Sequence, residues 1–84
     1  MRVPGPSMTR EHYDVLRRVV LEAVAAGDVE LDCAEVVAVD SSALALVLAA
    51  RRRAPSLHIK NVPDDLRALV RLYGLEQVFN ELYA

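Results

Sequence analysis

Aromatic side chains, cysteines and histidines are scarce in this chain of 84 residues, and each scarcity narrows what the protein can do. With three tyrosines, one phenylalanine and no tryptophan, the core must be built from aliphatic side chains. The one cysteine, Cys33, excludes an internal disulfide, which suits a reducing compartment. Its apolar neighbours indicate a small buried residue and not a reactive thiol. Two histidines and one cysteine are too few to indicate a metal site, so we expect no metal and no cofactor.

An excess of positive charge is also missing. The net charge is −2, whereas proteins that bind nucleic acid usually carry a clear basic excess. The longest apolar run, from Ala43 to Ala50, is far shorter than the roughly 20 residues needed to span a bilayer. The first residues contain no long apolar segment of the kind found in signal peptides. We therefore expect a cytoplasmic protein that binds no nucleic acid and reaches a membrane only through a partner.

What the chain does contain is an aliphatic-rich composition, 54% hydrophobic, that alternates between strand and helix patterns. We expect one domain over residues 1–84. An α/β fold is predicted, with a small, mainly parallel sheet of three or four strands and helices packed on it, because strands that alternate with helices pair in parallel.

The expected order is a short edge strand within Met1 to Met8, a helix from Arg10 to Ala26, a strand from Val29 to Cys33, a connection from Glu35 to Val39, a helix from Asp40 to Arg53, a strand from Leu57 to Lys60, a helix ending at Gly74, and a last short helix from Leu75 to Tyr83.

Helical spacing of apolar residues predicts which faces are buried. In the second helix we expect Leu44, Val47 and Leu48 to be deeply buried, and the arginines that end it to be solvated. The stripe of the first helix comprises Tyr13, Leu16, Val20 and Val24, and that of the third helix comprises Leu66, Leu69, Val70 and Tyr73.

The segment that carries chemistry is Asp40-Ser41-Ser42-Ala43-Leu44, at the start of the second helix. A helix N-terminus concentrates free N–H donors and partial positive charge. Two hydroxyls at this point could cap the helix, bind an anion, carry a phosphate or contact a partner. Simple capping is the plainest of these interpretations.

The stretch from Val29 to Phe79 resembles STAS domains, the family of bacterial anti-sigma-factor antagonists and related transporter modules. The resemblance rests on a strand ending in Leu31-Asp32, the segment Val39-Asp40-Ser41-Ser42-x-Leu44, an apolar helix, a strand, and a helix that ends in Tyr73-Gly74-Leu75. It implies a single STAS domain with a shortened N-terminal strand region. It also implies a role in binding another protein.

Two branches of that family imply two partners. The sequence from Asp40 to Leu46 resembles that of the STAS subunit of the Mla phospholipid-transport ABC transporter, which binds the ATPase subunit and supports its assembly and activity. This resemblance implies a cytoplasmic protein held at the inner membrane through a transporter complex. In the antagonist branch a partner kinase phosphorylates the serine after the aspartate, which is Ser41 here. The chain departs from the antagonists at Ala43, where glycine is usual, and at Pro4-Gly5-Pro6, where they have part of the kinase-facing surface. The resemblance therefore favours Asp40 to Leu44 as a partner-binding segment that contains a candidate phosphoacceptor.

An enzyme is not expected. Ser41, His58 and Asp32 could nominally form a triad, but the pattern does not bring His58 beside Ser41, and no nucleophile-elbow glycines surround the serine. The chain also lacks a glycine-rich phosphate loop.

Overall fold

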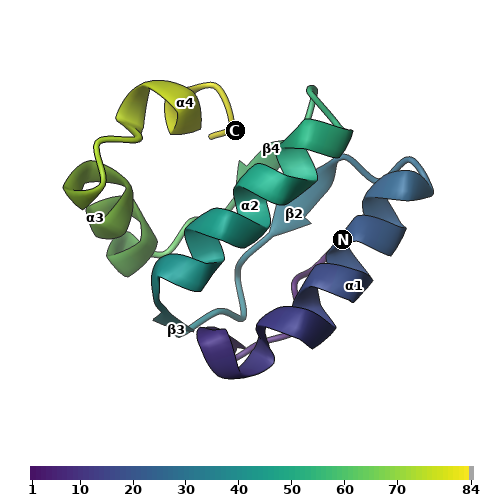
Figure 1. The fold of residues 1–84 in the computed structure, drawn as a ribbon, viewed down its shortest axis with the longest axis horizontal. Helices are drawn as coiled ribbons and strands as arrows, with labels where there is room; N and C mark the ends of the chain where they lie inside the picture. Colours follow the sequence, from purple (N-terminus) through teal and green to yellow (C-terminus); the bar gives the residue numbers. More distant parts are fainter. Residues whose placement is uncertain (84) are drawn as a thin grey trace.

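The computed structural model describes residues 1–83, and its paired strands all run in parallel (Figure 1). Strand β2 (Glu30–Asp32) pairs with β4 (His58–Lys60), and Leu31 stands opposite Ile59. Strand β1 (Ser7–Met8) pairs with β3 (Ala38–Val39). The prediction of parallel pairing is confirmed, but the four strands form two separate two-stranded sheets and not the one sheet of three or four strands that was predicted. The segment from Glu35 to Val39 is more than a connection, however, because its last two residues form β3, which is too short for the period-two pattern of a strand to show in the sequence.

The two ends of the chain extend the β2–β4 pair on either side. Near the start, the amide of Val3 donates to the carbonyl of Asp32 over 2.8 Å. Near the end, the amide of Ile59 donates to the carbonyl of Leu82 over 2.8 Å, and Tyr83 forms a parallel bridge with Ile59. The first and last described segments thus each add an isolated parallel bridge at one edge of the pair.

The helices lie close to their predicted positions. A 3-10 turn, η1 (Arg10–His12), leads into α1 (Tyr13–Ala25), so the first predicted helix is divided. Helix α2 spans Ser41–Arg53, α3 spans Asp64–Leu72 and α4 spans Glu76–Asn80. Gly27 and Gly74 follow α1 and α3 with φ of 97° and 69°, a left-handed conformation that glycine adopts readily. Helix α4 ends earlier than predicted because Glu81 and Leu82 form a turn, after which Tyr83 bridges to Ile59 of β4.

The core lies between the strands and the helices. Figure 1 shows α2 lying across β2 and β4, with α1 packed beside it and α3 and α4 at the other side of α2. Leu31 and Ile59 point into this core, whereas Glu30 and Lys60 are exposed on the opposite face of the strands. Parallel sheets are usually covered on both faces, so the alternation of apolar and charged residues here marks one open face.

Two burial predictions are wrong. Leu48 is only half-buried, although Leu44 and Val47 are buried as expected, because the neighbours of α2 leave that part of the helix surface partly open. Tyr73 is 54% exposed, and it lies just past Leu72, the last residue of α3. Of the two predicted stripes, Leu16, Val20, Val24, Leu66 and Val70 are buried, whereas Tyr13 and Leu69 are only partly buried.

Candidate protein-docking surface

Asp40 connects two elements at the start of α2. Its Oδ1 accepts a hydrogen bond from the amide of Ser42 over 2.8 Å, which caps the helix. Its Oδ2 accepts a hydrogen bond from the amide of Arg10 over 3.0 Å, which joins the η1 turn to α2. The Arg10 amide, followed by the Ser42 amide, lowers the pKa of Asp40 because both donors favour the carboxylate. Asp40 is therefore ionised, and its carboxylate holds the start of α2 in place against the η1 turn.

The other residues of the candidate segment divide into exposed and buried ones. Ser41, the first residue of α2, is exposed, and Ser42 is half-buried. Ala43 and Leu44 are 1% and 4% exposed, so they hold the helix in the core and do not form its surface. The amide of Ala43 donates to the carbonyl of Asp40, so this amide and that of Ser42 are already satisfied. What this helix start offers a partner is therefore mainly the Ser41 side chain.

An apolar groove lies beside the helix start. It is lined by Val39, which immediately precedes Asp40, and by the side of α3 that faces β3. Leu72 lines this groove and is 75% exposed. The remaining lining residues are Asp65, Ala68 and Leu69. The sequence did not predict this groove. The only indication in the sequence is that Leu72 lies outside the predicted buried stripe of α3.

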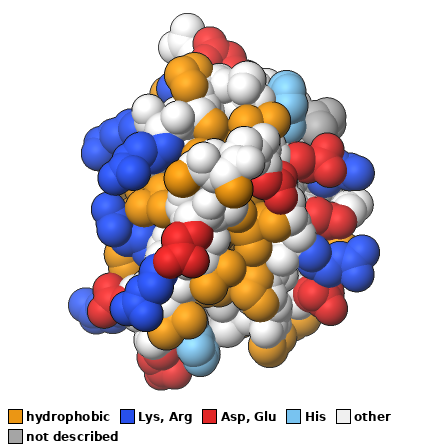
Figure 2. All heavy atoms as spheres, turned by 90° about the vertical axis from the view of Figure 1, so that its right-hand side faces the viewer, with side chains coloured by type: hydrophobic (Ala, Val, Ile, Leu, Met, Phe, Trp, Pro, Cys, Tyr) orange, Lys and Arg blue, Asp and Glu red, His pale blue; other side chains and the backbone are white. Residues whose placement is uncertain are grey.

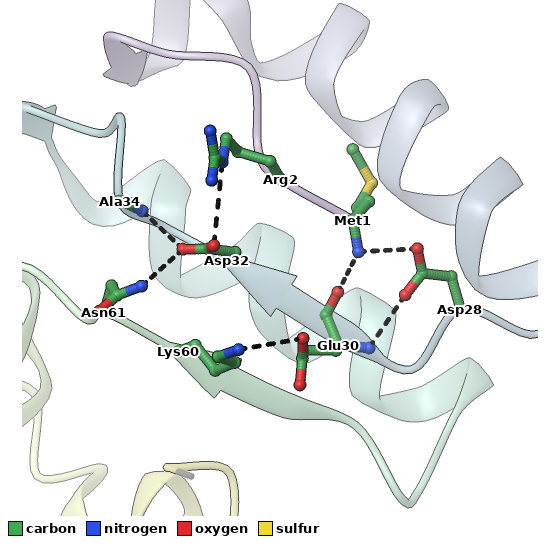
Figure 3. A network of polar contacts seen from close by, with 8 residues as sticks. All are labelled: Met1, Arg2, Asp28, Glu30, Asp32, Ala34, Lys60 and Asn61. Carbon is green, nitrogen blue, oxygen red and sulfur yellow. Dashed lines mark hydrogen bonds and ion pairs between the residues drawn. The ribbon is translucent and has the colours of Figure 1, made fainter.

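The nominal triad is not assembled. Asp32 lies at the end of β2, where its Oδ1 accepts hydrogen bonds from the Asn61 side chain over 2.9 Å and from the amide of Ala34 over 3.0 Å (Figure 3). These donors, with Asn61 first, lower the pKa of Asp32. His58 is exposed at the start of β4, where it stands opposite Glu30 and not opposite Asp32. The structure thus gives Asp32 a structural role at the end of the strand.

An α/β domain that presents an exposed serine and an apolar groove at one helix start is suited to contact with another protein. A family model described as "Mlab, STAS domain" matches residues 5–82, and the chain belongs to the STAS family. STAS domains generally mediate protein–protein interactions and are generally non-catalytic. No curated protein and no solved structure gives a significant match. Within residues 1–83, none of the helices has the length and apolar character required to cross a bilayer.

Proposed function

We propose that this STAS protein is a non-catalytic subunit that docks on the ATPase of a phospholipid-transport ABC transporter and supports its assembly and activity. The observation that carries the proposal is the exposed Ser41 at the start of α2, two residues after Val39, which lines the groove together with Leu72. Two observations support the choice of partner. The description of the matching family model names Mlab, and the sequence from Asp40 to Leu46 resembles that of the transporter branch.

The chemistry of the surface suits a partner that inserts an apolar side chain. Burying apolar surface contributes about 25 cal/mol per Å², so covering Leu72 and Val39 would stabilise a complex. The small Ser41 side chain allows the partner to approach the helix start closely. Asp40 holds that helix start in place through the amides of Arg10 and Ser42. The partner would therefore meet a surface that is already ordered.

The second candidate function is an anti-sigma-factor antagonist that a kinase switches by phosphorylating Ser41. The exposure of Ser41 favours it, because a kinase must reach the hydroxyl. A phosphate at this point would also be favourable, since anions are stabilised at helix N-termini. The sequence Pro4-Gly5-Pro6, where antagonists have part of their kinase-facing surface, favours the transporter role instead.

The test compares Ser41→Asp with Ser56→Asp. Ser56 is an exposed serine in the turn that follows α2, at the opposite end of that helix, so the two variants make the same chemical change at its two ends. A carboxylate at the start of α2 is tolerated or mildly stabilising in the free protein. At a packed interface, however, a charge without a partner loses its hydration, so Ser41→Asp should weaken binding to the transporter ATPase subunit. Ser56→Asp should bind normally.

Binding is measured by calorimetry with the purified ATPase subunit, and folding by thermal melts followed by circular dichroism. Leu72→Asp should also weaken binding without lowering the melting temperature, because Leu72 is exposed in the free protein. If Ser41→Asp and Leu72→Asp both bound the ATPase subunit at full strength and had normal melting temperatures, the docking surface would lie elsewhere. Stoichiometric phosphorylation of Ser41 by an anti-sigma kinase, without ATPase binding, would establish the second candidate function instead.

A further inference from the structure

A second surface feature runs along α1 and reaches the end of α2 that is opposite Ser41. Arg17 and Arg18 of α1 and Arg53, the last residue of α2, line an open depression between the two helices. Its apolar part is formed by Leu21 and Ala25. In Figure 2, Lys and Arg side chains gather along the left of the view, which is the side that faces the reader in Figure 1 and carries α1 and α2.

The arginines of this depression differ from the charges on the open face of β2 and β4. There the charges neutralise one another, since Lys60 lies 3.5 Å from Glu30 and Arg2 lies 3.8 Å from Asp32 (Figure 3). Within residues 1–83, Arg17, Arg18 and Arg53 have no carboxylate within ion-pairing distance. The neighbouring Arg51 is different again, because its guanidinium pairs with Glu81 over 2.5 Å.

We propose that this depression binds an acidic segment of a partner protein. The guanidinium groups of Arg17, Arg18 and Arg53 would pair with carboxylates of the segment, because the planar guanidinium matches a carboxylate in two parallel hydrogen bonds. The segment's apolar side chains would rest on Leu21 and Ala25.

The mixture of charges favours a protein segment over an anionic membrane. Asp14 and Glu22 also line the depression, and they would repel a continuous layer of anionic headgroups. A peptide can place its carboxylates opposite the arginines and other side chains opposite Asp14 and Glu22.

This surface is separate from the one assigned to the transporter ATPase. Helix α2 has 13 residues and is therefore about 20 Å long, with Ser41 at one end and Arg53 at the other. The protein could thus hold two partners, or two parts of one partner, at the same time. The inference does not rest on the proposed function.

The test uses the full chain labelled with ¹⁵N and a synthetic helical peptide with glutamates four residues apart and leucines between them. Adding the peptide should shift the amide signals of α1 and of the end of α2, and its affinity should fall as salt rises because exposed charges are screened. The double variant Arg17→Gln/Arg53→Gln should bind about tenfold more weakly, since its charge-assisted hydrogen bonds are lost. The matched control is Arg10→Gln/Arg71→Gln, which removes the same charge from arginines outside the depression.

Several results would overturn the inference. They are an absence of shifts at millimolar peptide, equal binding by the two double variants, or equal binding of a peptide in which lysines replace the glutamates. Binding to phosphatidylglycerol vesicles without binding to the peptide would assign the surface to a membrane. Ser41→Asp should leave peptide binding unchanged, which separates this inference from the ATPase proposal.

Discussion

Asp40 is the residue on which the geometry of the candidate docking surface depends, because its two carboxylate oxygens hold two different elements. We expect Asp40→Ala to lower the free energy of unfolding by about 0.5–2 kcal/mol, the usual effect of removing an N-cap. Asp40→Asn should lower the free energy of unfolding by less, since asparagine also caps helices well. Urea denaturation of the two variants measures the difference. A wild-type stability for Asp40→Ala would show that the hydrogen bond to Ser42 contributes little.

Cys33 is the residue whose chemistry the structure most clearly suppresses. It is 1% exposed, and burial raises the pKa of its thiol to about 11. Because the thiolate is the reactive form, we expect iodoacetamide at pH 8 to leave Cys33 unmodified in the folded protein. The same reagent in concentrated urea should modify it completely, which mass spectrometry would detect. Rapid alkylation of the native protein would mean that this part of the core opens readily.

At the scale of the element, α2 joins the core to the surface, so its positions should differ sharply in their effect on stability. Leu46 is 1% exposed, and truncating it to alanine should cost about 2–5 kcal/mol through lost burial and a cavity. Truncating the half-buried Leu48 to alanine should lower the free energy of unfolding by clearly less. Urea denaturation of the two single variants provides the comparison. Equal losses would mean that Leu48 is as deeply packed as the sequence pattern indicated.

The elements themselves were predictable where local signals were strong. The period of Leu16, Val20 and Val24 located α1, and Gly27 and Gly74 marked the ends of α1 and α3. The pairing of β1 with β3 was not predictable, because two-residue strands have no readable alternation. Periodicity also identifies the centre of a buried face and not its width, which explains the errors at Leu48 and Tyr73.

At the scale of the whole molecule, the candidate site was predictable only in its local part. The segment Asp40-Ser41-Ser42 indicated a helix start, because capping chemistry depends on adjacent residues. The groove could not be predicted, since Val39 and Leu72 meet only after α3 packs near β3. The depression along α1 depends likewise on α1 packing against α2, which places Arg17 and Arg53 along the same hollow. Contacts between distant segments thus complete both surfaces.

Carboxylates at three separate places link the stability of the whole fold to pH. The pKa values of Asp28, Asp32 and Asp40 all lie below their ordinary value of 3.8. The leading causes are, respectively, the N-terminal ammonium, the Asn61 side chain and the Arg10 amide. Each lowered pKa means that the unfolded chain takes up a proton at a higher pH than the folded chain does. Their contribution to stability is therefore fully present above about pH 4 and is lost as the pH falls through the folded-state values.

We accordingly expect the free energy of unfolding to fall steeply below about pH 4, as measured by urea denaturation at a series of pH values. Asp40→Asn should make the fall shallower, because asparagine does not titrate and one proton-linked group is removed. Asp64→Asn is the matched control: it removes an exposed aspartate in the first turn of α3, which has no side-chain cap hydrogen bond. If Asp40→Asn and the wild type showed the same slope, the hydrogen bonds from Arg10 and Ser42 would not favour the carboxylate, and Asp40 would hold the start of α2 by geometry alone.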